Sequence, residues 1–413
     1  MQDTMKRYQR SLEYGIKLKN NFRKVCKIYI IELCNFEDYP TGGQLSFAKQ
    51  MLIAFSGQIA LIGISTGSEP IKKWIKKEID GIEYDFFSVN KVHKYFNKPI
   101  IPNRIKGFYY LSRCRKELLF LEKENVFIQT PEVLFALRNW GIKNICFRSP
   151  GVENMLVSSR FWYAKYFKDI YESFLFNNLQ KVNTILASAD RNSIIDFCKR
   201  SNNRIRDYQI LQFPTRIDVS TFKPVDRLVA RKEIDFDFQR MLIITTGRLS
   251  SLKGWKFMIN CFELFTTTYP NSNFYFLGEG EDRSLIEKYI SERKLINKVF
   301  LIGRKDSETV ALYLNACDLY IMGSYVEGWS TSLVEAIACG VPVCTTNFSS
   351  AKELVTNNVN GFVCDKRDES EFVMKMNQAL NLPKKALLEK SFEMNKFSVT
   401  NLKNDLLGCW RIE

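Results

Sequence analysis

The sequence has very little histidine and no closely paired cysteines. Among its 413 residues there is one histidine, His93, and the 11 cysteines are scattered, the closest being Cys339 and Cys344. With no C-x-x-C pair and an odd number of cysteines, the sequence indicates neither a disulfide framework nor a zinc site. A reducing compartment such as the cytosol fits this cysteine usage best.

Long apolar segments are also missing. The longest nearly apolar run, Met51 to Ser65, is too short to span a bilayer and contains Gln58 and two glycines. We expect this run to be the end of a helix followed by a strand. The first residues, "MQDTMKRYQRSLEYG", lack the apolar core of a signal peptide. These features predict a soluble protein of the cytoplasm.

The basic residues are unevenly distributed. Residues 1–224 contain 36 Lys and Arg against 21 Asp and Glu, whereas the remainder contains 24 of each. The net charge of +15 therefore lies entirely in the first half. This asymmetry indicates that the first half meets something anionic: nucleic acid, an anionic membrane surface or a phosphorylated acceptor.

Two basic segments of this half are candidates for membrane contact. "IKKWIKKEI" (Ile71 to Ile79) sets Trp74 among four lysines, as segments at membrane interfaces often do. Taken alone, however, this segment fits the solvated face of a helix with one half-buried Trp slightly better than it fits a membrane contact. The second candidate is the basic stretch from Lys6 to Lys27.

Short β-rich runs alternate with helix-length segments along the chain. The runs of the first half are Cys26 to Leu33, Gln58 to Ser65, Asn125 to Thr130, Asn144 to Ser149 and Thr184 to Ala189. The second half contains "MLIITTGR", "NFYFLGEG", "VFLIGR", "LYIMGS" and "VPVCTT". Mostly apolar strands separated by helices predict α/β domains with doubly wound parallel sheets covered on both faces. The series is interrupted once, at Gln212 to Arg227.

We place the domain junction at this interruption. The prediction is a first domain over residues 1–220, a second over 221–395, and a C-terminal helix within 396–413 that packs back toward the first domain. In doubly wound sheets, ligands bind beyond the carboxyl ends of the strands, and two such domains can share a cleft. Candidate functional residues should therefore follow strands.

Three loops of the second domain contain such residues. In "IITTGRLSSLKGW", Gly247 and Arg248 end a strand and Lys253 precedes a helix, so the two cations are placed to surround a diphosphate. Gly303 and Arg304 end another strand, where exposed backbone could read a nucleotide base. Gly278-Glu279-Gly280 resembles a dinucleotide fingerprint only in part, and we interpret its glycines as tight-turn residues.

The segment "VEGWSTSLVEAIACG" follows the strand "LYIMGS" and places Glu327 and Glu335 around a run of small hydroxylated residues. Ser332 and Glu335 fit a capping box for a helix that begins near Ser332. That interpretation leaves Glu327, Gly328 and the backbone amides of Trp329, Ser330 and Thr331 unexplained.

This segment resembles the E-x7-E motif of retaining glycosyltransferases with the GT-B fold, in particular family 4. The order of neighbouring segments is also similar: "GGQLSFAKQML" (Gly42 to Leu52), "FPTRIDVSTFKP", "TTGRLSSLKG", "LGEGED" and "NGFVCD". The resemblance covers nearly the whole second domain and is patchy over the first. It implies two Rossmann-like domains that face a central cleft.

The resemblance also implies roles for individual residues. Glu327 would orient the donor sugar, helped by the amides of Gly328 to Thr331, and Glu335 would bind the ribose. Arg248 and Lys253 would clamp the diphosphate and stabilise its growing charge. Gly42 and Gly43 would bring backbone amides to the phosphate. No metal or other cofactor is implied, and retention would come from same-face attack, with a donor phosphate oxygen accepting the acceptor's proton.

Two positions depart from the family pattern. Many members have a histidine near the donor sugar, where this chain has Arg148 and Ser149 in "ICFRSPGVEN". His93 lies outside that context, and we do not expect it to be catalytic. The glycine pair often found after the last core strands is replaced by Ser349 and Ser350.

The predicted function is therefore a retaining, metal-independent transfer of a hexose-type sugar from a UDP- or GDP-sugar to a glycan or lipid-linked glycan acceptor. The charge asymmetry predicts a peripheral enzyme on the inner face of the cell membrane, in surface-polysaccharide or glycolipid biosynthesis. A nucleotide-sugar epimerase on the same architecture is the second reading. A basic non-enzymatic binding protein is the third, although no nucleic-acid-binding signature supports it.

Overall fold

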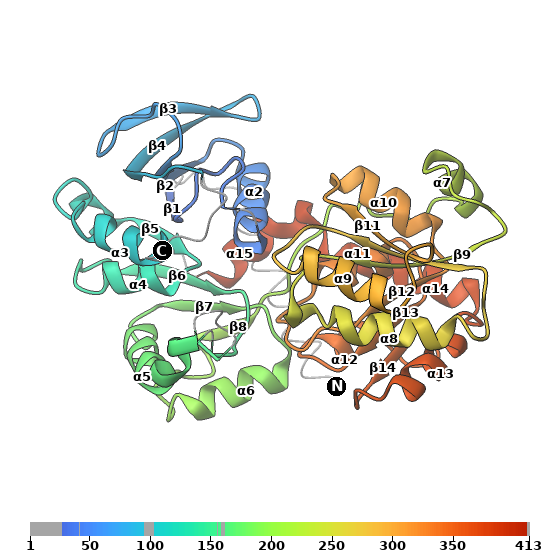
Figure 1. Ribbon diagram of the computed structural model, residues 1–413. Coiled ribbons are helices and arrows are strands. Elements are labelled where there is room, and N and C mark those ends of the chain that lie inside the picture. The colour runs from blue at the N-terminus through green and yellow to red at the C-terminus, as the bar shows by residue number, and fades with distance from the viewer. Residues whose placement is uncertain (1–26, 41, 95–102, 155, 158–161, 411–413) are drawn as a thin grey trace, which may run out of the picture.

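The computed structural model describes residues 27–40, 42–94, 103–154, 156–157 and 162–410. It consists of two α/β domains that lie side by side, coloured blue to green and yellow to red in Figure 1. Each domain is built on one sheet. The strand order is β3-β4-β2-β1-β5-β6-β7-β8 in the first domain and β11-β10-β9-β12-β13-β14 in the second.

The first sheet is parallel except for β3, which runs antiparallel to β4. Its strands are β1 (Ile28–Ile31), β2 (Ile59–Ser65), β3 (Trp74–Ile79), β4 (Ile82–Lys91), β5 (Asn125–Ile128), β6 (Asn144–Ser149), β7 (Thr184–Ala187) and β8 (Ile210–Gln212). The helices are α2 (Gly43–Phe55), α3 (Asn103–Ser112), α4 (Pro131–Leu137), α5 (Lys168–Leu179) and α6 (Arg191–Arg200), with the 3-10 helices η2 (Leu119–Lys123) and η3 (Trp162–Phe167).

The second sheet is parallel throughout. Its strands are β9 (Met241–Thr246), β10 (Ser272–Leu277), β11 (Val299–Gly303), β12 (Leu319–Met322), β13 (Val343–Thr346) and β14 (Gly361–Cys364). The helices are α7 (Arg227–Glu233), α8 (Trp255–Phe265), α9 (Arg283–Glu292), α10 (Ser307–Ala316), α11 (Thr331–Ala338), α12 (Ala351–Leu354), α13 (Glu369–Ala379) and α14 (Lys384–Glu393), with η4 (Ser251–Lys253) after β9.

Apolar clusters cover both faces of each sheet, as expected for parallel strands that are buried on both sides. Strands β1, β2, β5, β7, β12 and β13 are buried at every position. The prediction of a doubly wound parallel architecture is confirmed, and Met51 to Ser65 is the end of α2 followed by β2.

After α14 the chain passes through η5 (Met394–Phe397) and η6 (Val399–Asn401) to α15 (Leu402–Cys409). Helix α15 contacts α2, and Leu402, Leu406 and Trp410 join an apolar cluster of the first domain. Arg216 forms an ion pair with Asp405 at 2.8 Å. Figure 1 shows α15, in red, between the two domains. The last helix therefore fastens the end of the chain to the first domain.

The interpretation of "IKKWIKKEI" as a helix is wrong, because this segment forms β3 and its approach. Lys77 is buried, and its ammonium group pairs with Glu37 at 2.7 Å and with Glu69 at 2.9 Å. Lys76 pairs with Asp85, and Lys72 with Glu117. Trp74 packs against the rings of Phe87 and Phe120. Three of the four lysines of this segment are therefore paired with acids of the first domain.

The second basic candidate, Lys6 to Lys27, lies outside the described residues except for Lys27, which pairs with Asp85. Among the described residues, no helix is long and apolar enough to cross a membrane.

Candidate functional site

The loop between β9 and α8 begins the site. Gly247 (φ 135) and Gly254 (φ 67) adopt backbone conformations that favour glycine. A Cβ atom at Gly254 would lie 1.8 Å from the carbonyl oxygen of Gly323, which follows β12. Glycine at this position lets the β9–α8 loop lie directly against the carboxyl end of β12. A pocket of ≈ 320 Å³ there is lined by residues that include Gly247, Arg248, Lys253 and Ser324.

Lys253 and Glu327 form the central ion pair of the site. The ammonium nitrogen of Lys253 lies 2.5 Å from Oε1 of Glu327, which also accepts a hydrogen bond of 2.7 Å from the hydroxyl of Ser324. The two charged side chains are only 28% and 15% exposed. The expected diphosphate cation and the expected sugar-orienting acid therefore contact each other. Glu327 also balances the charge of Lys253, a task that the sequence does not reveal.

Arg248 lies at the outer rim of the same pocket. Its Nε donates to Oε2 of Glu281 at 2.7 Å, and both side chains are well exposed. Glu281 belongs to the loop between β10 and α9. Among the described residues, the side chain of Arg248 is thus held by one exposed ion pair, which a diphosphate could replace without loss to the fold.

The glycines of the β10–α9 loop, interpreted from the sequence as tight-turn residues, allow close packing against the neighbouring β9–α8 loop. A Cβ atom at Gly278 would lie 1.9 Å from the carbonyl oxygen of Gly247, and one at Gly280 would lie 2.2 Å from that of Leu249. Gly303 ends β11 with φ 82, and Arg304 beyond it is exposed.

The start of α11 differs from the prediction. Ser330, not Ser332, is the N-cap, and its hydroxyl accepts from the amide of Leu333. The helix therefore begins at Thr331, and Glu335 falls too deep in it for a capping box. The reason lies outside the local sequence, because the amide of Ser330 is itself held by the hydroxyl of Ser350 at 3.2 Å.

This arrangement also changes what the loop can offer a sugar. The amide of Ser330 is already bonded, and Trp329 is buried against Phe397 with ring centroids 5.5 Å apart. Gly328 and Thr331 remain the better placed of the four residues for backbone contact with a ligand. Fewer of the four expected backbone amides, those of Gly328 to Thr331, are therefore available to a sugar.

The side chain of Glu335 has no partner among the residues that the structure describes. It occupies a half-buried position on α11, and within the described part of the chain its carboxylate makes no hydrogen bond. Burial raises the pKa of Glu335 to about 8. The carboxylate is only half-buried and is not engaged by the described residues, so it is available to a ligand.

Gly328 is where the second domain meets the first. A Cβ atom at this position would lie 2.2 Å from the carbonyl oxygen of Pro150 and 2.5 Å from that of Ser188. These residues follow β6 and β7. Only glycine permits so close an approach, so the loop that carries Glu327 lies directly against the carboxyl end of the first sheet.

The serine pair after β13 reinforces this contact. The hydroxyl of Ser349 accepts from the amide of Asp190 at 3.0 Å, and Glu353 accepts from the amide of Arg191 and the side chain of Gln212. Ser349 therefore acts in the domain contact and Ser350 holds the amide of Ser330, which accounts for hydroxyl groups where the family pattern has glycine.

Arg148 and Ser149 do not face the pocket as a histidine substitute would. Arg148 is fully buried, and it donates to Gln129 at 3.0 Å and to Ser188 at 2.9 Å. Its guanidinium lies 3.9 Å from the ring centroid of Phe47, and burial lowers its pKa to about 9. The hydroxyl of Ser149 donates to the carbonyl of Gly151. Both residues fix the ends of strands beside the domain contact.

Gly42 and Gly43 begin α2, on the side of the first domain that faces the second (Figure 1). Gly42 is an N-cap with no side-chain hydrogen bond, and a Cβ atom would meet nothing within 4 Å at either glycine. The first amides of α2 are thus uncapped and uncovered, as a phosphate contact requires.

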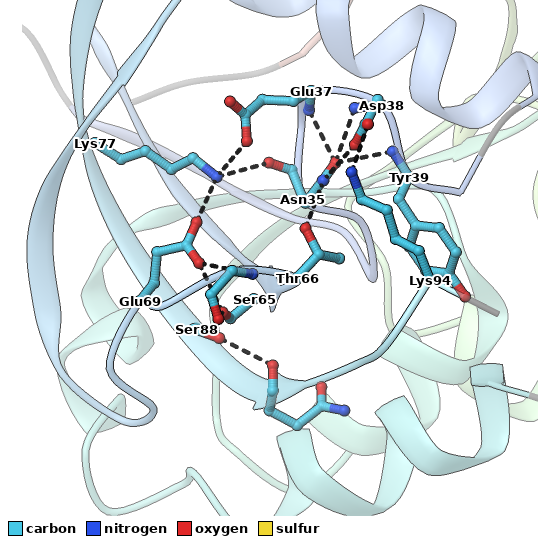
Figure 2. A network of polar contacts seen from close by, with 12 residues as sticks. Asn35, Glu37, Asp38, Tyr39, Ser65, Thr66, Glu69, Lys77, Ser88 and Lys94 are labelled. Carbon is cyan, nitrogen blue, oxygen red and sulfur yellow. Dashed lines mark hydrogen bonds and ion pairs between the residues drawn. The ribbon is translucent and has the colours of Figure 1, made fainter.

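The loop that leads to these glycines is held by the network in Figure 2. The side-chain oxygen of Asn35 accepts from the amides of Glu37, Asp38 and Tyr39. Lys77 joins this loop to Glu69 and also donates to the carbonyl of Asn35. The basic segment singled out from the sequence therefore supports the β1–α2 loop.

Sequence reasoning also missed Arg367. It donates to the carbonyls of Gly323 and Ser324 and stacks on Tyr325, with 3.6 Å between the guanidinium and the ring centroid. It fixes the segment that leads to Glu327. The only signal was its position in the segment after β14. His93 is exposed just beyond β4.

Residues 226–393 match the family model of glycosyl transferases group 1. Relatives include an uncharacterized glycosyltransferase of Haemophilus influenzae, 28% identical over 142 residues, which are 34% of this chain and 40% of that protein. The poly(glycerol-phosphate) alpha-glucosyltransferase of Bacillus subtilis is 27% identical over 184 residues, 44% of this chain and 26% of that protein. The matched segments thus span less than half of these relatives.

Solved structures match nearly the whole chain at low identity. Sucrose-phosphate synthase from Thermosynechococcus elongatus has a TM-score of 0.70 at 15% identity, covering 92% of this chain and 98% of that one. Anabaena HepE in complex with UDP-glucose has the same TM-score, identity and coverage. The chain has the GT-B fold, and its second domain matches the model of glycosyl transferases group 1. These matches favour neither the epimerase nor the binding protein.

Proposed function

We propose that the protein is a retaining glycosyltransferase that moves a hexose-type sugar from a UDP- or GDP-sugar to a glycan or lipid-linked glycan acceptor. The observation that carries this proposal is the Lys253–Glu327 ion pair, which lies beside the carboxyl ends of β9 and β12. The loop that contains Glu327 lies against the first domain at Gly328. A cation and an acid paired in this way can each exchange the other for a part of the donor.

In the proposed complex, Lys253 and Arg248 turn to the diphosphate. Their charges stabilise the negative charge that grows on the leaving nucleoside diphosphate as the glycosidic bond breaks. The uncapped start of α2 at Gly42 and Gly43 adds backbone donors from the first domain. Glu327, released from Lys253, accepts hydrogen bonds from sugar hydroxyls and orients the ring.

Glu335 binds the ribose, because its carboxylate is the one acid of the E-x7-E segment that lacks a partner among the described residues. Gly328 and Thr331 contribute amides, and Gly303 with Arg304 contacts the base. The acceptor hydroxyl attacks from the face that the leaving group vacates, and a donor phosphate oxygen takes its proton. No metal takes part in this scheme.

Names of relatives support the acceptor class. Beside the Bacillus subtilis enzyme, the alpha-monoglucosyldiacylglycerol synthase of Acholeplasma laidlawii is 26% identical over 126 residues, 30% of this chain and 32% of that protein. One name specifies a polymer and the other a lipid. These names support our proposal that the protein acts in surface-polysaccharide or glycolipid assembly. The basic excess of the first half is the reason for proposing that it does so at the inner face of the cell membrane.

Product analysis tests the proposal. The protein is incubated with nucleotide sugars and candidate acceptors, and the products are examined by NMR. We expect a glycoside with the anomeric configuration of the donor. An inverted product would contradict retention, and an altered nucleotide sugar with no glycoside would identify an epimerase.

A further inference from the structure

Helices α3 and α5 expose an unusual number of large apolar side chains. On α5 and the turn before it, Tyr166, Phe167 and Ile170 are 77%, 57% and 71% exposed. On α3, Ile105, Tyr109 and Tyr110 are also exposed. Single exposed apolar residues are normal, but aromatic side chains gathered on neighbouring helices mark an interaction surface.

These helices belong to one face of the first domain. Helix α4 contacts both α3 and α5, and Figure 1 shows the three helices along the same side of the domain. Phe174 of α5 packs on Phe135 of α4 with ring centroids 4.7 Å apart. We call the exposed side chains of these helices the α3–α5 face.

Basic residues lie between the apolar ones. The order around the start of α5 is Lys165-Tyr166-Phe167-Lys168, and α3 adds Arg104, Lys106 and Arg113, all exposed. Arg138, at the end of α4, is exposed beside Phe174. The exposed acid on these turns of α3 and α5 is Asp169. The face is therefore strongly basic as well as aromatic.

This mixture favours a lipid surface over a protein. The centre of a protein interface is depleted of lysine, whereas a segment at an anionic bilayer combines lysine and arginine with aromatic side chains that enter the headgroup layer. Basic side chains also gain from the negative potential of such a surface.

The face reaches the candidate site along two routes. Arg104 of α3 donates to the side chain of Gln44, in the first turn of α2. A second pocket, of ≈ 440 Å³, extends from Tyr171 and Leu175 of α5 to Gly151, which faces Gly328 across the domain contact. A molecule held in a bilayer at this face would therefore lie beside the entrance to the site.

We propose that the α3–α5 face docks on the headgroup layer of an anionic membrane, with its aromatic side chains inserted and its lysines and arginines on the lipid phosphates. If the proposed glycosyl transfer is correct, the acceptor is then a lipid-borne molecule presented from that membrane. This surface replaces the hairpin at Lys72 to Lys77 as the membrane contact.

Flotation of the full chain with vesicles tests the proposal. Vesicles of phosphatidylcholine alone are compared with vesicles that also contain phosphatidylglycerol, over a series of salt concentrations. We expect binding that needs the anionic lipid and declines as salt screens the charges. Absence of binding to either vesicle, or equal binding to both, would overturn the proposal.

Variants locate the contact. The triple variant Tyr166→Ser, Phe167→Ser and Ile170→Ser should lower the coefficient for partition onto anionic vesicles by at least about tenfold. Lys165→Glu with Lys168→Glu should weaken it by roughly fivefold or more per residue. Matched controls are Leu388→Ser with Phe392→Ser, exposed apolar residues on α14 of the second domain, and Lys72→Gln with Lys76→Gln in the hairpin. Equal losses in the controls would overturn the assignment.

Two further readouts separate this inference from its rivals. If the wild-type chain fails to float and self-associates through Tyr166 and Phe167, the face is a contact between copies and the proposal fails. Release of nucleoside diphosphate from a nucleotide sugar, measured without vesicles but with lipid-linked acceptors dispersed in detergent, tests the proposed function by itself. Turnover without flotation overturns the membrane inference alone, and flotation without turnover contradicts the transferase alone.

Discussion

Lys253 and Glu327 are 74 positions apart in the chain, and their charged groups meet at 2.5 Å beside the carboxyl ends of β9 and β12. Each belongs to a loop that glycine brings close to another element, Gly254 for Lys253 and Gly328 for Glu327. The pair joins the two loops of the second domain that the proposed donor would contact.

Replacing Glu327 by alanine should abolish sugar transfer while the fold remains intact. The ion pair is partly exposed, so its loss should cost about 1 kcal/mol of the free energy of unfolding. Turnover and denaturant unfolding are measured on the same preparations, together with Lys253→Met and the double variant. Normal turnover of Glu327→Ala would refute the assigned role, and a stability loss as large as that of a core truncation would make the role structural.

Replacing Arg248 by alanine should lower turnover by about 10²–10³-fold, because a cation that stabilises developing charge is lost. Its stability should change by less than about 0.5 kcal/mol, since the side chain is exposed. Arg283→Ala is the matched control, because Arg283 is also paired with a loop glutamate, Glu279, at 2.6 Å. Similar turnover in both variants would remove Arg248 from the site.

Chelation should leave activity unchanged. In the proposed mechanism, Lys253, Arg248 and the start of α2 supply the charge that a divalent cation would otherwise provide. Initial rates are compared in EDTA and in added Mg²⁺ or Mn²⁺ after the protein has been dialysed. Activity that requires a divalent metal would overturn the proposed mechanism.

Glu335 should make stability depend on pH. Its pKa is raised from 4.5 to about 8 by burial, so between these values the native state holds a proton that the unfolded chain has lost. The free energy of unfolding should therefore fall as pH rises through this window and level off above about pH 8. In Glu335→Gln the decline should be smaller. Some decline should remain, because burial also raises the pKa of Glu32 to about 8.

Bound nucleotide gives a second readout of Glu335. In the proposed complex, ribose hydroxyls donate to the ionised carboxylate of Glu335. The affinity for nucleoside diphosphate should therefore rise between pH 7 and pH 9 in the wild-type chain. The affinity of Glu335→Gln should be lower and nearly constant with pH. Calorimetric titration at several pH values measures both, and a parallel pH dependence in the two proteins would exclude this role.

Lys77→Met should weaken the loop that leads to Gly42 and Gly43. Removing the ammonium leaves Glu37 and Glu69 without their common partner (Figure 2), and breaking such a buried pair costs about 3 kcal/mol. The apparent KM for the donor should rise more than kcat falls, because the substituted residue does not touch the reacting atoms. Lys77→Arg should restore most of the loss. A change in stability with unchanged KM would confine Lys77 to the hairpin.

The strands and the E-x7-E segment were predictable because their signals are local. Apolar runs gave β1, β5 and β9, and the order of glycines and charges after the strands indicated the loops of the site. The hairpin of β3 and β4 was missed because Lys77 occupies an inward position that partners from distant segments, Glu37 and Glu69, make favourable.

The start of α11 shows the same limit. Ser330, Thr331 and Ser332 can each cap a helix, and the choice is made by Ser350, which lies twenty positions later and binds the amide of Ser330. The pairing of Lys253 with Glu327 likewise depends on how two loops meet. Local pattern predicts which residues reach the site, and tertiary contacts decide which of them are already occupied.

The most direct test of the central claim is release of nucleoside diphosphate from a panel of UDP- and GDP-sugars, with the wild-type chain and Glu327→Ala assayed side by side. The account predicts release from at least one donor by the wild-type chain, faster with an acceptor present, and none by the folded variant. No release from any donor by the folded wild-type chain, or equal release by both proteins, would contradict it.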